Sequence, residues 1–273
     1  MTGPFECGAM LVRLLDHRGL GVPELADRAG VMAPDLRAVL AGASPDAELL
    51  RWLATALGLH AVDLFVLAGV PVPDDLLPWD AAAARWASDI VQDGVHLPAA
   101  GRQVLLEVIR SLPREERDPD PEPAQVRPLS DGPGGRVIGM TRCRNLRLPG
   151  LAQALAVVTP SCLAASTYGR IGDGGKDLTP RLVMDFAALL GIDALDLSAL
   201  TGVALPEPPP PAAPEAVDAA ALLWEARRLS AAQAKLVAEL ARAMRPAPRN
   251  CYQLNLSGSD AFRPLIHTQA SAV

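Results

Sequence analysis

The strongest constraint on the fold of this chain is an internal repeat. Residues 14–36 align with residues 140–162, and residues 48–70 align with residues 181–203. The matched positions include Arg18 with Arg144, Leu25 with Leu151, Pro34 with Pro160, Leu57 with Leu190 and Asp63 with Asp196. A sequence that repeats over this length is built from one structural unit used twice.

The repeat continues in a second pair of segments, 97–112 and 229–244. Each segment has apolar residues at helical spacing, with Val104, Leu105, Val108 and Leu112 in one and Leu236, Val237, Leu240 and Met244 in the other. Ser230 and Gln233 form a capping-box pattern at the start of the second segment. Half of the residues are hydrophobic and only 4% are aromatic, so leucine, valine and alanine build the core. The sequence therefore predicts an all-α protein.

Proline and glycine divide the chain. Residues 113–135 and 206–217 are rich in these residues and predict a linker and a stiff polyproline spacer. Residues 246–273 show no helical period and are expected to form a disordered tail. The expected organisation is a first domain at 1–78, an appendage at 79–112, the linker at 113–135, a second domain at 136–205, the spacer at 206–217, an appendage at 218–245 and the tail. We expect the two halves to fold independently.

The repeated unit resembles a known family. In the first copy, Leu25-Ala26 precede Gly30-Val31, and Leu36 and Val39 follow before Gly42. Residues 49–57 then form a helical pattern ending at Gly58, and a short one follows at 63–67. This order resembles the phage-repressor helix-turn-helix class, also called the Cro or xenobiotic-response-element class. The resemblance implies two tandem five-helix lambda-repressor-like domains, each followed by a helical appendage. Lysine occurs only at Lys176 and Lys235, which indicates a GC-rich bacterial genome.

The second copy departs from this pattern. Ala156 stands at the position of Gly30, which is suited to the left-handed conformation that ends a helix. The second copy also contains several extra residues, which we place in a glycine-rich loop at 168–177.

In this family the start of the third helix reads DNA bases. Carried onto this chain, the reading positions are Ala33, Pro34, Asp35, Arg37 and Ala38 in the first copy and Thr159, Pro160, Ser161, Leu163 and Ala164 in the second. Residues 1–78 contain five basic and ten acidic residues, whereas residues 136–203 contain seven basic and five acidic ones. Because phosphate repels an acidic surface, the second copy is the expected DNA contact.

The candidate DNA-binding residues follow from this charge difference. Arg142, Arg144 and Arg147 are expected to hold the phosphate backbone, while the hydroxyls of Thr159 and Ser161 contact phosphate or base. Arg37 is the corresponding candidate in the first copy. The alternative is that the three clustered arginines form a solvated helix face.

Two functions are consistent with the sequence. The first is a bacterial transcriptional regulator that binds double-stranded DNA, with tandem copies in place of a dimer. The alternative is a protein–protein adaptor or assembly component that keeps the scaffold without its DNA contact, and binds a protein partner or itself through the appendages.

Other classes find no support in the sequence. The four cysteines and four histidines have no metal-site spacing, so no metal is expected. Since no phosphate-binding loop follows a strand and no nucleophile has a recognisable partner, we expect neither an enzyme nor a cofactor. Residues 148–169 carry no charge, but Pro149, Gln153 and Pro160 interrupt them, so we expect no membrane span and a cytoplasmic protein.

Overall fold

The chain is all-helical. The structure, a computed structural model, describes residues 7–115 and 128–245, and this part of the chain contains helices and turns but no β-strand. The expected disordered tail at 246–273 lies outside the described residues. Within the described ranges no helix is both long and apolar enough to cross a membrane.

Five helices form the first unit, which follows the first copy of the repeat. They are α1 (Cys7–Arg18), α2 (Val22–Ala29), α3 (Ala33–Leu40), α4 (Ala47–Ala56) and α5 (Ala61–Ala68). Gly30 ends α2 in the left-handed conformation, at φ 67°, and three residues separate α2 from α3. Leu25, Leu36 and Val39 are buried, so α2 and α3 pack onto the unit core as the sequence predicts.

Five helices also form the second unit. They are α8 (Pro133–Arg142), α9 (Leu148–Val158), α10 (Ala165–Gly172), α11 (Pro180–Leu190) and α12 (Ala194–Thr201). Helix α8 begins at Pro133, inside the segment expected to be linker, because proline is well accepted in the first turn of a helix. Leu151 is buried at the position equivalent to Leu25.

The extra residues of the second unit lie mostly at 159–164, between α9 and α10, and not in the segment 168–177. Helix α9 continues to Val158, and residues 159–164 separate it from α10. Ala156 has no glycine-like freedom to end the helix where Gly30 ends α2. As a result, Tyr168 and Ile171 are the large buried side chains of the third helix, at the places that Leu36 and Val39 fill in the first unit.

Four further helices form what we call the appendage bundle. They are α6 (Ala84–Val95), α7 (Ala99–Ser111), α13 (Pro214–Ala226) and α14 (Ala231–Met244), and short 3₁₀ turns at Asp74–Leu76 and Ala81–Ala83 lead into α6. Helix α13 begins at Pro214, three residues before the expected end of the proline spacer at 217. The predicted capping box of Ser230 and Gln233 is present at the start of α14.

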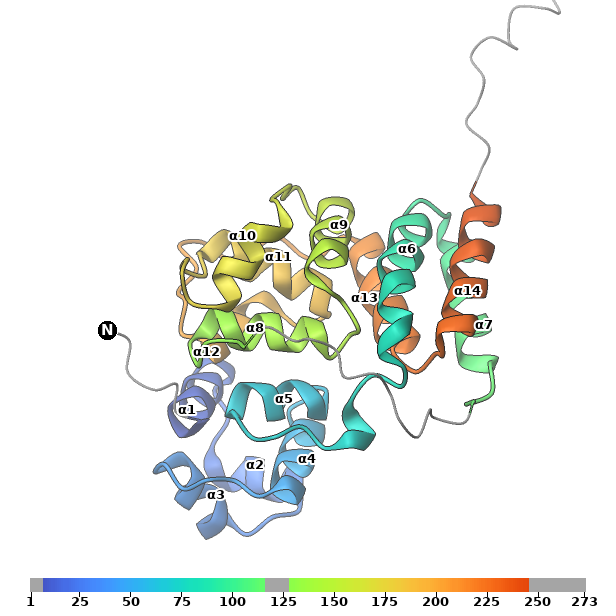
Figure 1. Cartoon of the computed structure of the whole chain (residues 1–273). Helices are drawn as coiled ribbons and strands as arrows, with labels where there is room; N and C mark the ends of the chain where they lie inside the picture. Colours follow the sequence, from blue (N-terminus) through green and yellow to red (C-terminus); the bar gives the residue numbers. More distant parts are fainter. Residues whose placement is uncertain (1–6, 116–127, 246–273) are drawn as a thin grey trace, which may run out of the picture.

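The two units pack against each other, with the bundle at one side (Figure 1). Helix α1 lies against α12 and helix α8 lies against α5, so the first helix of each unit contacts the last helix of the other. Helix α6 contacts both α13 and α14, which joins the two appendages. One hydrophobic cluster includes Leu14 and Leu64 of the first unit with Ile138 and Leu197 of the second. The halves therefore share a core, contrary to the expectation of independent halves.

Candidate functional site

A buried ion pair joins the two units. Arg144, at the end of α8, donates from Nη1 and Nη2 to the two carboxylate oxygens of Asp63 on α5, at 2.6 and 2.7 Å. Both side chains are fully buried. Arg144 also donates to the carbonyl oxygen of Leu190, at 3.0 Å. A bidentate pair with this geometry fixes the position of one unit on the other.

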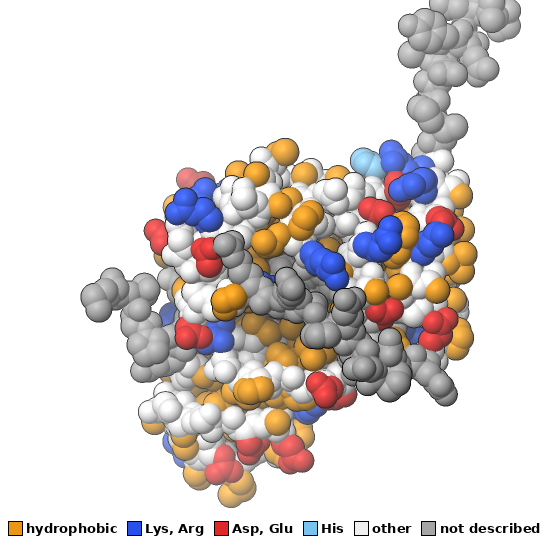
Figure 2. All heavy atoms as spheres, in the orientation of Figure 1, with side chains coloured by type: hydrophobic (Ala, Val, Ile, Leu, Met, Phe, Trp, Pro, Cys, Tyr) orange, Lys and Arg blue, Asp and Glu red, His pale blue; other side chains and the backbone are white. Residues whose placement is uncertain are grey.

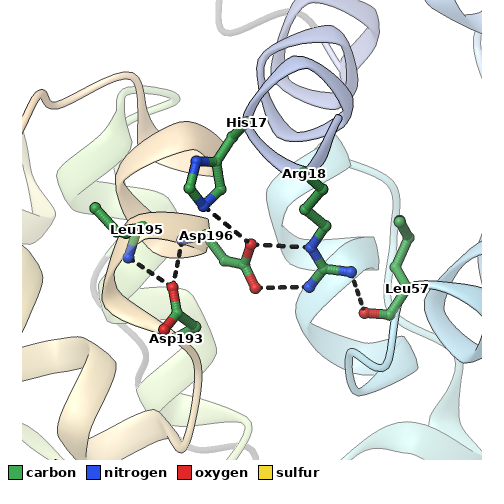
Figure 3. Close-up of polar contacts among 6 residues, drawn as sticks. All are labelled: His17, Arg18, Leu57, Asp193, Leu195 and Asp196. Carbon is green, nitrogen blue, oxygen red and sulfur yellow. Dashed lines mark hydrogen bonds and ion pairs between the residues drawn. The ribbon is translucent and has the colours of Figure 1, made fainter. Parts of the chain in front are cut away.

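A second ion pair repeats this arrangement with the units exchanged. Arg18, at the end of α1, donates from Nε and Nη2 to the carboxylate of Asp196 on α12, at 2.9 and 2.6 Å. Its Nη1 donates to the carbonyl oxygen of Leu57, at 2.8 Å (Figure 3). Since Arg18, Leu57 and Asp196 match Arg144, Leu190 and Asp63 in the repeat, the two units meet in a pseudo-two-fold interface.

The appendage bundle follows the same symmetry. Arg110 on α7 donates to Glu225 on α13 at 3.0 Å, and Arg242 on α14 donates to Asp93 on α6 at 3.3 Å. Arg110 and Arg242 are matched positions of the repeat. Asp93 and Glu225 are separated by the same number of residues as Arg110 and Arg242, so they are matched positions too. The chain therefore has the plan of a two-fold dimer contained in one polypeptide.

His17, Asp193 and Asp196 are the one group of potential metal ligands within the described residues. The His17 Nε2 atom lies 3.8 Å from Asp196 Oδ1. However, both oxygens of Asp196 already accept from Arg18, and Asp193 Oδ1 accepts from the backbone N–H groups of Leu195 and Asp196 (Figure 3). The Arg18 guanidinium already neutralises this carboxylate and would repel a cation, so the geometry favours a clamp between α1 and α12.

The three arginines predicted to hold DNA are dispersed by the fold. Arg144 is a correction to the predicted site: it lies in the interior, paired with Asp63, and no nucleic acid can reach it in this structure. Arg142 is half-buried at the end of α8, and burial lowers its pKa. Only Arg147 is exposed, with its Nη2 3.5 Å from the carbonyl oxygen of Ala81.

The two predicted hydroxyl donors lie in the lengthened turn before α10, not at its start. Thr159 is buried, and its hydroxyl donates to the carbonyl oxygen of Leu155 at 2.8 Å. The Ser161 hydroxyl donates to the buried carboxylate of Asp185 on α11. Both hydroxyls therefore hold the turn onto its own unit. Arg37 is exposed on α3, as predicted.

The face around the turn between the second and third helices differs between the units. In the second unit, Asp185 is covered by the lengthened turn, and α6 packs over α9, where Gly150 lies close to Ser88 and Gln153 contacts Gln92. In the first unit, Trp52 stands at the position of Asp185 and is 48% exposed. Met32, at the α2–α3 turn, is 67% exposed. Helix α6 and the lengthened turn therefore cover part of this face in the second unit, whereas Trp52 and Met32 are exposed in the first.

Aromatic rings and arginine side chains lie close together where the first unit, the second unit and the appendage bundle meet. The His60 imidazole is stacked on Trp224 of α13, and the Arg227 guanidinium lies 3.8 Å from the centre of the Trp224 ring. Burial lowers the pKa of His60 to about 4, and the nearby cations of Arg144 and Arg227 act in the same direction. His60 is therefore neutral at ordinary pH.

Comparisons with protein-family models, with curated proteins and with solved structures give no match to this chain. The site residues that sequence reasoning missed are Asp63, Asp196 and Trp52. A signal for the first two was present, because an arginine and an aspartate recur at matched positions in both copies.

Proposed function

We propose that this chain is a single-chain pseudo-dimer of helix-turn-helix-like units that serves as a non-catalytic protein adaptor. The resemblance of residues 9–70 and 135–203 to phage-repressor domains supports the scaffold, and each copy supplies five helices in the order that this family has. Under this proposal the scaffold is kept for its shape, and the first unit carries the binding face.

The contrast between the two faces carries the proposal. The second unit has the positive charge that DNA binding needs, yet Arg144 is buried, Thr159 and Ser161 are engaged internally, and α6 packs over α9. The first unit has an open face, where the exposed side chains of Met32 and Asp35 lie around Arg37, and the unit as a whole carries more acidic than basic residues. Phosphate is repelled by such a surface, whereas methionine and aromatic side chains are enriched in protein interfaces.

Figure 2 agrees with this division of the surface. Hydrophobic and acidic side chains lie together at the lower end of the view, over the region of α2, α3 and α4. Arginine and lysine side chains lie at the upper right, over the appendage bundle and with acidic side chains among them, and at the upper left, over the second unit.

A photo-crosslinking experiment tests the adaptor. A benzoylphenylalanine residue replaces Met32 in the intact chain, and irradiation is carried out in the cells that express it naturally. The expected result is a defined protein adduct that the same residue placed at Ala232, an exposed position on α14, does not give. Adducts with DNA at position 32, or equal protein labelling at both positions, would refute the proposal.

DNA binding is the second candidate function, because one observation favours it. The exposed side of α10 carries Ser166 and Arg170, and the sequence has no acidic residue from 132 to 172. A duplex would then contact Arg147 and Arg170. The test is a titration with mixed genomic duplexes at low and physiological salt, using Arg170→Glu with Arg114→Glu, an exposed arginine just after α7, as the matched reversal. Selective loss of binding in Arg170→Glu would favour this function over the adaptor.

A further inference from the structure

We propose that the first unit binds a basic peptide segment with an apolar anchor side chain, seated over α4 at Trp52 and Met32. This inference rests on the proposed adaptor function and names the site and the chemistry of its partner.

The repeat shows how this position on α4 is covered. In the second unit, residues 159–164 form an extra segment of non-helical chain between α9 and α10, and Ser161 in that segment donates to Asp185 on α11. Asp185, which also pairs with Arg181 on α11 at 3.3 Å, is 3% exposed. The second unit thus demonstrates that a short segment of chain fits against the outer side of its fourth helix.

The first unit has no such segment. Its turn has only three residues, and the residue equivalent to Asp185 is Trp52, which remains 48% exposed. Because the turn of the second unit reaches Asp185, position 52 faces the corresponding turn of the first unit, where Met32 lies. From this correspondence we infer that the two large exposed apolar side chains, Trp52 and Met32, lie on the same side of the first unit.

The charge around this place selects the partner. Asp35 on α3 lies one turn after Met32, and Glu48 lies one turn before Trp52 on α4; both carboxylates are exposed. Of the basic residues nearby, Arg37 is exposed and Arg51 is paired with Asp75 at 2.9 Å. Described residues 7–78 contain nine acidic and five basic side chains. A segment with lysine or arginine on both sides of an apolar residue is complementary to this surface, and an acidic segment is not. A buried aromatic or aliphatic anchor supplies most of the affinity in interfaces of this kind.

The experiment uses three fluorescein-labelled nonapeptides and the intact chain. The first has two leucines between lysine- and arginine-rich ends, the second replaces the leucines by alanines, and the third replaces the basic residues by glutamates. Anisotropy titrations at low salt measure the affinities. We expect the first peptide to bind at least about tenfold more tightly than either of the others, a difference of about 1.4 kcal/mol.

Variants of the chain locate the site. Trp52→Ser and Glu48→Lys are each expected to weaken the first peptide about fivefold or more, whereas Leu236→Ser and Glu107→Lys, matched changes at exposed positions on the bundle, leave it unchanged. The indole N–H signal of Trp52 in a ¹⁵N correlation spectrum should shift on binding. Circular dichroism of each variant checks that it is folded.

The outcomes separate this inference from the adaptor proposal. No binding by the first peptide, or binding that Leu236→Ser weakens and Trp52→Ser does not, would overturn the inference. The adaptor proposal would stand in either case if position 32 still crosslinks to a protein. Equal binding of the first two peptides would show that charge alone acts and would also overturn the inference.

Discussion

Replacing Arg144 by methionine tests whether the two units are held together as the structure shows. Methionine keeps much of the length of the side chain and removes its charge, which leaves the Asp63 carboxylate fully buried without its partner. Breaking a buried pair from one side costs about 3–5 kcal/mol, because the remaining charge stays desolvated. The carbonyl oxygen of Leu190 also loses a donor. We expect the free energy of unfolding to fall by about 3–5 kcal/mol.

The repeat supplies a matched control for this measurement. Arg18→Met removes the equivalent arginine from a pair whose arginine side chain is 28% exposed. Because water reaches this pair, the expected loss is about 1 kcal/mol. Urea denaturation followed by circular dichroism compares the two variants. The double variant Arg144→Met with Asp63→Leu removes both buried charges. Its loss of free energy of unfolding should be smaller than the sum of the losses of the two single variants by about 2 kcal/mol or more.

Two results would refute this reasoning. A loss below about 1 kcal/mol in Arg144→Met, or equal losses in Arg144→Met and Arg18→Met, would mean that Arg144 is not buried as described. Strict additivity in the double variant would mean that Arg144 and Asp63 do not interact. Reversal of Arg144 to glutamate is expected to disrupt the interface between the two units. Loss of DNA binding in that variant would therefore not show that Arg144 contacts DNA.

Three further predictions follow from packing and protonation. Leu25→Ala and Leu151→Ala should each lower the free energy of unfolding by about 2–5 kcal/mol in the same denaturation assay, because both leucines are buried at equivalent positions. Gly8→Ala and Gly134→Ala should both lower the melting temperature strongly, since a Cβ atom at either glycine would lie 2.5 Å from a backbone oxygen of the third helix, Val39 or Ile171; Gly132→Ala, whose nearest contact would be at 3.8 Å, is the control. For His60 the folded pKa of about 4 lies below the unfolded value of 6.5, so its contribution to stability is present above pH 6.5 and is lost as the pH falls toward 4. The melting temperature of the wild type should therefore fall relative to that of His60→Phe between pH 7 and 4, and parallel curves would contradict the low pKa.

The packing of each unit could be predicted well from the repeat. Leu25 and Leu151 align in the sequence and are both buried, because helical periodicity places the same face inward in each copy. The all-helical class followed from the same periodicity and from the shortage of aromatic residues. These are local properties, which a sequence carries directly.

The position of the extra residues in the second unit could not be predicted in the same way. The extra residues were assigned to 168–177 because glycines there indicate a loop, and that segment does contain the end of α10 and the loop after it. The insertion lies mainly before α10 because Ala156 does not end α9. Tyr168 then fills the core position, and an aromatic residue among glycines gave little sign of that.

Contacts between the two units decide which of the predicted arginines are buried and which are exposed. Arg144 and Arg147 are only three residues apart, and a count of charge treats them alike. Burial of the first and exposure of the second follow from the position of α5, which belongs to the other unit. Charge composition therefore indicated which copy is basic but not which of its cations face solvent.

The two units can differ in their faces because both belong to one chain. In a dimer of identical chains every substitution appears on both faces, so covering one face also covers the other. In this chain each copy has changed separately: Gly150 and Gln153 accept α6 in the second unit, whereas Glu24 and Arg28, which stand at positions 150 and 154 of the repeat, form an exposed ion pair in the first. A side chain as large as glutamate at position 150 would not fit beside Ser88, where even a Cβ atom would lie 3.2 Å away. The pseudo-two-fold interface is thus retained by its paired Arg–Asp contacts, while the outer faces are free to take different roles, one as a seat for the appendage bundle and the other as the proposed binding face.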